Sequence, residues 1–247
     1  MNGAEPDTAP AMVAIETATE TVAVAVRTPA GVQAEMALTG RRRHVETLTP
    51  ALAHLLTQVG LVPSDLGVVA VDIGPGLFTG LRVGVAAAKG LAQSLGVGVI
   101  GETSLDILTA AAAEAGLRGL VLACVDARRG EVFATVHEIG AAGVDPVARL
   151  TPGLFAPADL VAALDRFAGA PLHAVGDGAQ RYAPLLQAAT GVETVTPGLS
   201  FPPPAALLNL AQARLDAGAA PVAPAAVVPL YMREADATSN FARAVRA

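Results

Sequence analysis

The segment GLVLACVDARRGEVFATVHEI, residues 119–139, contains an apolar run, a polar turn and an alternating run, which together predict two strands joined by a hairpin. Residues 11–29, AMVAIETATETVAVAVRTP, have the same outline, and an acidic residue, Asp126 or Glu16, ends the first strand of each segment. A repeat of this kind predicts a duplicated α/β unit; two unrelated hairpins are the alternative.

Strand and helix patterns alternate around the two hairpins. In the first half we expect strands at 12–17, 21–27, 32–38, 67–73 and 97–100, and helices at about 45–59, 79–95 and 104–115. Pro50 lies inside the first helix, so that helix either bends or restarts with Thr49 as its cap. After Pro152 the pattern weakens to a strand near 172–175 and helices near 157–167, 179–189 and 204–217. Strand, helix, strand order predicts parallel crossovers.

The composition is that of a globular protein without a membrane span. The chain has 247 residues, of which 53% are hydrophobic and 15% charged, and Arg, Asp, Glu, Gly or Pro interrupts every apolar run. The acidic N-terminus lacks the basic and apolar regions of a secretory signal, so we expect a cytoplasmic protein. The net charge of −6 argues against a broad nucleic-acid surface, and the single cysteine, Cys124, excludes a disulfide framework.

Residues 72–92, DIGPGLFTGLRVGVAAAKGLA, combine a glycine loop with a helix that carries small residues every four positions. The glycine spacing fits neither the dinucleotide fingerprint nor the P-loop. The small residues of the helix are Gly80, Gly84, Ala88 and Ala92. Because each interior glycine costs about 1 kcal/mol relative to alanine, the stripe predicts close approach of another backbone. That backbone belongs either to this protein's own sheet or to another molecule.

Patterns that carry catalysis are scarce. None of the four histidines has a second ligand at a helical spacing suited to a metal pair, and no Gly-x-Ser-x-Gly nucleophile turn occurs. Arg41–Arg43 form a basic cluster before the first helix, either solvated or in contact with an anion or RNA.

Five segments closely resemble the TsaB (YeaZ) proteins in order and spacing. They are AIETAT (14–19), RRRHVETLTP (41–50), GPGLFTGLRVG (74–84), DARRGEV (126–132) and PLYMR (229–233). The resemblance covers residues 12–135 well and the remainder thinly. It implies an α/β fold of two actin/Hsp70-like (ASKHA) lobes, each a mixed sheet with flanking helices. We expect lobes at 12–117 and 118–235, a C-terminal helix that can pack back on the first lobe, and disordered tails at 1–11 and 236–247.

The resemblance also implies a function. Related TsaD proteins transfer a threonylcarbamoyl group to the adenosine next to the anticodon in tRNAs that read codons beginning with A. TsaB proteins are similar to TsaD but act as its non-catalytic partner, together with the ATPase TsaE, and meet tRNA indirectly through the complex. Pairing in the family uses the helices equivalent to about 44–59 and 78–93. The expected interface residues are Val45, Leu48, Leu52, Leu55, Gly80, Leu81, Gly84, Val85 and Ala88.

The remaining motif residues are expected to shape loops and turns, with no catalytic, metal-binding or cofactor-binding residue among them. They are Gly74, Pro75, Gly76, Phe78, Thr79, Arg82, Glu16 and Asp126. The first turn, from Glu16 to Glu20, has no glycine and an acid at each end, which would repel phosphate. Catalytic relatives carry a histidine pair four residues apart, whereas here Leu48 follows His44. We therefore expect no metal and no strong ATP site in the isolated chain; any ATP or ADP binding would be confined to the partner complex.

Two further expectations concern assembly. An uncovered apolar helix face predicts a two-fold homodimer of the isolated chain, and Gly84→Leu is expected to abolish partner binding. Two other functions stay open at this point. One is an enzyme that is active on its own, either an ATP-dependent transferase or kinase or a peptidase-like enzyme. The other is a homodimeric interaction module unrelated to tRNA.

Overall fold

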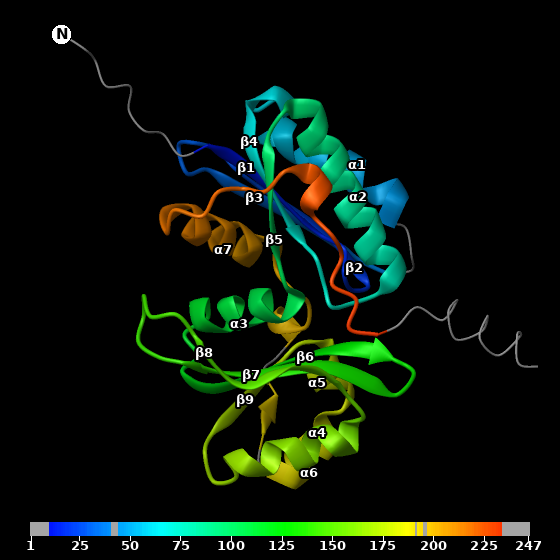
Figure 1. The fold of residues 1–247 in the computed structure, drawn as a ribbon, viewed down its shortest axis with the longest axis vertical. Helices are drawn as coiled ribbons and strands as arrows, with labels where there is room; N and C mark the ends of the chain where they lie inside the picture. Colours follow the sequence, from blue (N-terminus) through cyan, green and yellow to red (C-terminus); the bar gives the residue numbers. More distant parts are fainter. Residues whose placement is uncertain (1–9, 41–43, 191, 195–196, 234–247) are drawn as a thin grey trace, which may run out of the picture.

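Two five-stranded sheets, one in each lobe, form the framework of the chain (Figure 1). The structure is a computed structural model and describes residues 10–40, 44–190, 192–194 and 197–233. The expected tails lie outside these residues, except for Pro10 and for Ala11, which is the buried first residue of the first strand. Arg41–Arg43 also lie outside them.

The two sheets have the same strand order. The first contains β1 (Ala11–Glu16), β2 (Thr21–Arg27), β3 (Gln33–Thr39), β4 (Leu66–Asp72) and β5 (Gly98–Glu102), arranged β3-β2-β1-β4-β5. The second contains β6 (Gly119–Arg128), β7 (Glu131–Ile139), β8 (Val147–Phe155), β9 (Leu172–Val175) and β10 (Glu193–Thr194), arranged β8-β7-β6-β9-β10. In both, the first three strands are antiparallel and the last two run parallel to the first. The predicted duplication and the two-lobed actin/Hsp70-like α/β fold are confirmed.

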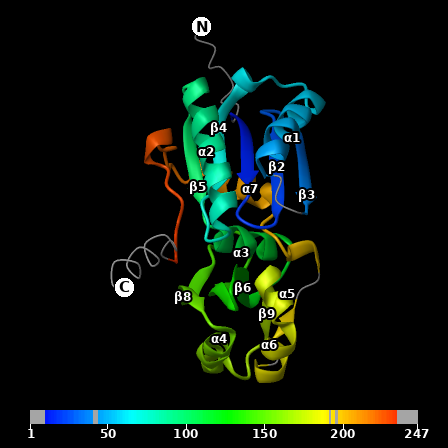
Figure 2. The same cartoon turned by 90° about the vertical axis from the view of Figure 1, so that its right-hand side faces the viewer.

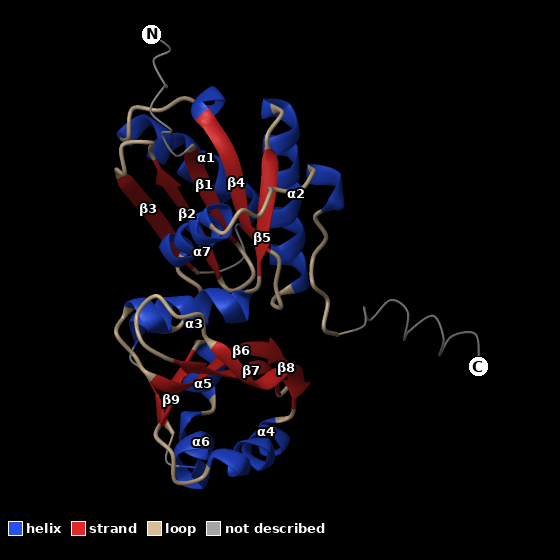
Figure 3. Ribbon diagram, turned by 60° about the vertical axis from the view of Figure 1, so that its left-hand side comes forward, coloured by secondary structure: helices blue, strands red, loops and turns tan. Residues whose placement is uncertain are grey.

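Helices α1 (His44–Gln58) and α2 (Phe78–Leu95) lie side by side on one face of the first sheet (Figure 2). The opposite face is covered by α7 (Pro204–Asp216), which comes from the second half of the chain (Figure 3). Helix α3 (Ser104–Glu114), although it follows β5, packs on the second sheet and against α7. Each half therefore contributes one helix to the other lobe, and α3 lies between the lobes.

The far face of the second sheet is covered by α4 (Pro157–Leu164), α5 (Asp177–Arg181) and α6 (Ala183–Thr190). Short 3-10 helices occur at Pro63–Asp65, Asp165–Phe167, Pro197–Leu199 and Pro224–Ala226. Within the described residues, no helix has both the length and the apolar character needed to cross a membrane.

Four details differ from the expectations or resolve them. Helix α1 runs through Pro50 without restarting at Thr49. The region near 179–189 forms two helices, α5 and α6, which are separated at Tyr182. Strand β8 has no predicted counterpart because Pro152 interrupts its pattern. Pro152 is tolerated because β8 is an edge strand and because its pairing with β7 shifts register next to this proline. The alternating pattern of residues 131–139 predicts an outward-facing His137, but this side chain is buried against α3.

Candidate partner-binding groove and interlobe turns

The small residues of α2 face the chain's own first strand. Gly80, Gly84, Ala88 and Ala92 are all buried. A Cβ atom at Gly80 would overlap the carbonyl oxygen of Thr17, and one at Gly84 would overlap the Thr17 hydroxyl. That hydroxyl donates a hydrogen bond to the Gly80 carbonyl oxygen at 2.8 Å. The stripe lets α2 approach the turn after β1, so the interpretation that another molecule covers it is wrong.

Most of the expected interface residues share this burial. Those inside the monomer are Leu48, Leu55, Gly80, Leu81, Gly84, Val85 and Ala88. Val45 is 72% exposed, and Leu52 is half-buried. The reason is general: the apolar periodicity of a surface helix marks the side that faces its own core. A partner surface on these helices must use their outer sides.

An apolar groove of about 480 Å³ runs between the outer sides of α1 and α2. Its lining consists of Val45, Leu48, Thr49, Phe78, Thr79, Arg82, Val83, Ala86 and Ala87. Val45 and Phe78, 72% and 42% exposed, are large apolar side chains that contribute to it. The structure thus brings Val45 and Leu48 together with Phe78, Thr79 and Arg82, which the sequence assigned to a loop motif.

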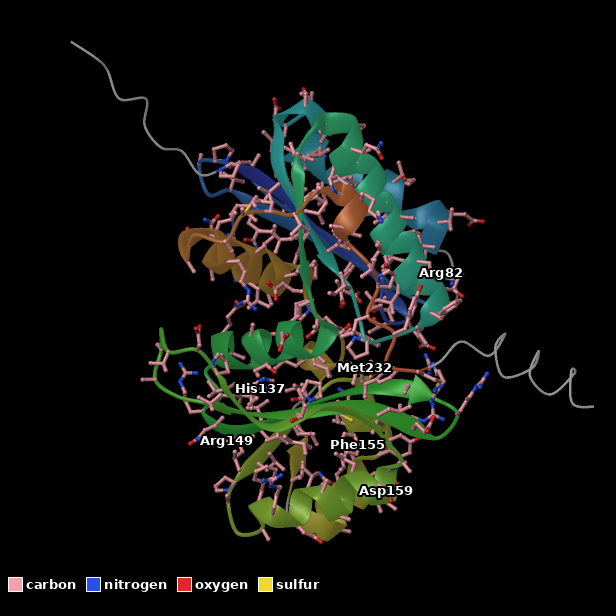
Figure 4. All side chains as sticks on the ribbon, viewed as in Figure 1. Arg82, His137, Arg149, Phe155, Asp159 and Met232 are labelled. Atoms are coloured by element: carbon pink, nitrogen blue, oxygen red, sulfur yellow. The ribbon has the colours of Figure 1, made fainter. Side chains whose placement is uncertain are left out.

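Arg82 is held in a fixed position at one end of this groove. Its guanidinium carbon lies 3.8 Å from the centre of the Phe78 ring, one helical turn earlier. Its Nε donates a hydrogen bond to the Tyr231 hydroxyl at 3.1 Å, and the Phe78 and Tyr231 rings are 5.2 Å apart. Figure 4 shows Arg82 on the part of α2 nearer the second lobe. These three side chains form an exposed cluster, which we call the Arg82 cluster.

The sequence alone indicates no role for Tyr231, although this residue lies in PLYMR (229–233), one of the segments that carry the resemblance. The segment after Pro224 runs along α2 and back toward the second lobe (Figure 1). Lys89 Nζ donates to the Val227 carbonyl oxygen at 3.0 Å, and Leu230 N donates to that of Ile73 at 2.7 Å. Contacts between segments so far apart leave no local pattern in a sequence, so the PLYMR motif was the signal that could have identified Tyr231.

The loop between β4 and α2 is organised by Asp72. Its Oδ1 accepts hydrogen bonds from Gly74 N at 2.7 Å and from Ser104 Oγ at 2.8 Å. Ser104 N donates to the Gly74 carbonyl oxygen at 3.0 Å, and the Gly74–Pro75 peptide bond is cis. The loop is thereby fixed to the start of α3.

The turn after β1 is enclosed by both outer helices. The Ala18 carbonyl oxygen accepts a hydrogen bond from Leu77 N at 2.6 Å, and a Cβ at Gly76 would overlap it. His44 Nε2, on α1, lies 3.1 Å from the Thr19 carbonyl oxygen. Carbonyl oxygens therefore occupy the space beside the first turn of α2, where a phosphate would otherwise approach the helix N-terminus.

Two carboxylates are fully buried at the ends of the adjacent parallel strands β1 and β4. Glu16 and Asp72 are both 0% exposed. Burial, together with repulsion from Asp72, raises the pKa of Glu16 well above its ordinary value. Burial raises the pKa of Asp72 to about 7. Glu16 Oε2 and Asp72 Oδ2 have no hydrogen-bond partner among the described residues. Burial therefore favours the protonated form of both groups more than it is favoured in an exposed carboxyl.

Carboxyl groups of the chain itself accept hydrogen bonds from backbone N–H groups in two turns, Glu16–Glu20 and Asp126–Gly130, which we call the interlobe turns. Glu16 Oε1 accepts from Ala18 N at 2.8 Å, and Asp126 Oδ1 accepts from Arg128 N at 2.9 Å. In each case the donor lies two residues after the acid. The N–H groups of Ala18 and Arg128 thus already have acceptors within the chain, which disfavours a phosphate at these turns.

The corresponding carboxylate of the second lobe is paired. Asp126 Oδ2 accepts from Arg128 Nη1 at 2.8 Å and from Arg181 Nη1 at 2.9 Å. Arg128 also reaches Glu20 of the first lobe at 2.5 Å, so an ion pair links the two turns. Burial raises the pKa of neighbouring Asp177 to about 6. Across the residues that the structure describes, no three His, Cys, Asp or Glu side chains are grouped as metal ligands.

Comparison with known proteins gives extended matches. Residues 17–241 match the family described as TsaD: tRNA N6-adenosine threonylcarbamoyltransferase. The uncharacterized protein Mb3455c of Mycobacterium bovis is 34% identical over 236 residues, which cover 92% of this chain and 93% of that protein. The tRNA threonylcarbamoyladenosine biosynthesis protein TsaB of Escherichia coli is 36% identical over 122 residues, 49% of this chain and 52% of that protein.

Solved structures agree with this assignment. A Pseudomonas aeruginosa protein described as similar to peptidase YEAZ superimposes with a TM-score of 0.79 at 25% identity, covering 91% of this chain and 100% of that one. YeaZ from the same organism gives a TM-score of 0.76 at 23% identity over 90% and 100% of the two chains, which shows the fold. Because the family match spans most of its length, this chain belongs to the TsaD family and, within it, to the TsaB (YeaZ) proteins.

Proposed function

We propose that this chain is a non-catalytic subunit for the formation of N6-threonylcarbamoyladenosine in tRNAs that read codons beginning with A. A TsaD-like subunit would transfer the threonylcarbamoyl group from its adenylate to the adenosine amino group, with release of AMP. This chain would bind that subunit and hold it in its active conformation. Family membership supports the pathway, and the groove between α1 and α2 is the observation that supports a binding role.

The interlobe turns support the non-catalytic part of the proposal. Backbone N–H groups there are bonded to Glu16 and Asp126, and both Glu16 and Asp72 are sealed from solvent. A substrate would have to displace these internal contacts before it met a reactive group. We therefore propose that the isolated chain has no cofactor of its own and that any bound ATP or ADP belongs to the partner complex.

The other members of the assembly follow from the family. We propose that a TsaE-like ATPase joins the pair and that tRNA is contacted through the complex rather than by this chain alone. A second copy would cover the α1–α2 groove when the TsaD-like subunit is absent, giving a homodimer that the partner displaces.

The test is reconstitution with the TsaD-like and TsaE-like proteins of the same organism. The modified nucleoside, measured by mass spectrometry after tRNA digestion, should form with this chain present and fall to background without it. Unchanged modification without this chain would contradict the proposal. Calorimetric titration of the isolated chain with ATP should show no micromolar binding, and catalytic turnover by the chain alone would show that it is an enzyme.

A further inference from the structure

The Arg82 cluster brings a fixed positive charge to an otherwise uncharged groove. Among the described residues that line the groove, Arg82 is the one with a charged side chain. We propose that Arg82 is the specificity contact of this groove and that it pairs with a carboxylate carried beside the apolar face of the partner's docking segment. This inference rests on the proposed binding role of the groove and names the chemistry that the groove selects.

The geometry leaves the guanidinium available for such a pairing. Arginine has five N–H donors, and Nε is committed to the Tyr231 hydroxyl. The Phe78 ring lies over one face of the guanidinium, whose donors lie in the plane of the group. Within the described part of the chain, no carboxylate lies within ion-pair distance of Arg82. A partner carboxylate could therefore accept two parallel hydrogen bonds, the arrangement that a planar guanidinium favours.

Covering the groove makes this pairing necessary. Val45, Val83 and Ala87 are apolar lining residues, and a docked segment would remove water from them and from Arg82 together. A guanidinium that loses water without gaining an anion weakens binding strongly. A partner that carries an acid at this position is thus accepted, and one that lacks it is rejected.

The same charge argues for a different protein rather than a second copy as the preferred occupant. A two-fold dimer brings the same patch together from both copies. The groove lining contains Arg82 but contributes no carboxylate from the described residues, so two copies would meet without a partner for either guanidinium. A TsaD-like subunit with a suitably placed acid satisfies the charge and should displace the homodimer.

The first experiment measures binding of the full chain to the TsaD-like subunit by surface plasmon resonance. Arg82→Met should weaken binding about 30-fold or more, mainly through faster dissociation, because a desolvated charge is left unpaired on the partner. Tyr231→Phe, which keeps the ring but removes the acceptor for Nε, should weaken it several-fold. Arg166→Met is the matched control: this exposed arginine also lies over a ring, that of Phe167, but in the second lobe. It should leave binding unchanged.

The second experiment identifies the carboxylate. Asp and Glu residues of the partner are changed to Lys one at a time, and each variant is combined with Arg82→Glu. At the contacting residue, the Lys change and Arg82→Glu should each weaken binding alone, and their combination should restore it. Removal of residues 234–247, which contain Glu234 and Asp236, should leave the dependence on Arg82 in place. If affinity no longer depended on Arg82 in the shortened chain, the carboxylate that pairs with Arg82 would belong to this chain's own C-terminal residues, and the proposal would be wrong.

The outcomes separate the two levels of inference. If the unaltered chain fails to bind the TsaD-like subunit, the proposed function fails and this inference fails with it. If the unaltered chain binds but Arg82→Met changes the affinity less than twofold, the proposed function stands and the Arg82 inference is wrong. Stronger dependence on Arg82 in the homodimer than in the heterodimer would also overturn it.

Discussion

Two rows of residues on helix α2, both spaced four apart, have opposite environments. Gly80, Gly84, Ala88 and Ala92 are buried, and the two glycines lie against the end of β1 and the turn that follows it. The other row, formed by Phe78, Arg82, Ala86 and Gly90, is exposed. The first row fixes the helix to its own sheet at backbone distance, whereas Phe78, Arg82 and Ala86 of the second row form the outer wall of the groove.

The contrast between the buried and the exposed row shows what a stripe of small residues on a helix indicates. A glycine stripe indicates that some backbone comes close, and here that backbone is the chain's own strand. The surface available to a partner lies around the helix from it and is marked by exposed Phe78 and Val45 and by the fixed charge of Arg82. Variants in each row should therefore separate folding from binding.

The largest expected effect is that of Gly84→Leu, which we now expect to act on folding. The added side chain would enter the space of Thr17 and Ile15, so the free energy of unfolding should fall by about 3 kcal/mol or more. Chemical denaturation measures this change. Gly90→Leu is the matched control, because a Cβ there meets open space. A Gly84→Leu chain that is as stable as the control would show that the inner row tolerates another arrangement.

Ala86→Arg in the outer row should have the converse effect. Ala86 is exposed on the groove wall, and arginine is a good helix former, so stability should change by less than about 0.5 kcal/mol. Affinity for the TsaD-like subunit should fall about thirtyfold, equivalent to ~2 kcal/mol, because a second cation enters the apolar groove. Calorimetric titration and thermal unfolding of the same sample give both values. Unchanged affinity would remove this wall from the interface.

The sequence predicted the hairpins and the position of α2 because both depend on local periodicity, and it predicted the duplication because residues 11–29 and 119–139 share one outline. It did not predict which side of α2 faces solvent, because Gly80 and Ala86 look alike until the position of β1 is known. It also gave no role to Tyr231, whose partner Arg82 lies far away in the chain. Strand β8 was missed because Pro152 disrupts the pattern that an edge strand can tolerate.

The carboxylates beneath the inner row should make stability depend on pH. Burial raises the pKa of Asp72 to about 7, above the ordinary value near 4, so the folded chain holds this proton more tightly than the unfolded chain. The resulting stabilisation is present at acidic pH and is lost as the pH rises from about 4 to about 7. Asp72→Asn should therefore make stability fall less steeply with pH over this range, by up to about 1.4 kcal/mol per pH unit.

The measurement is denaturant unfolding at several pH values between 5 and 8. Asp159→Asn, which changes an exposed carboxylate on α4 (Figure 4), should leave the slope of stability against pH unchanged. Glu16 should maintain part of the slope in the Asp72→Asn chain, because its pKa is also raised by burial. An identical slope in the unaltered and Asp72→Asn chains would show that Asp72 stays ionised throughout.

The smallest expected effect is that of Gly90→Ala in the outer row. Gly90 lies in the helix interior, where alanine is favoured over glycine by up to about 1 kcal/mol, and a methyl group there contacts nothing within 4 Å. Stability should therefore rise by an amount between about 0.5 and 1 kcal/mol, measured by denaturant unfolding. Since the groove lining ends at Ala87, affinity for the partner should stay the same. Weaker binding by Gly90→Ala would instead extend the docking surface along α2, which would give this glycine the close-approach role that the inner glycines have toward β1.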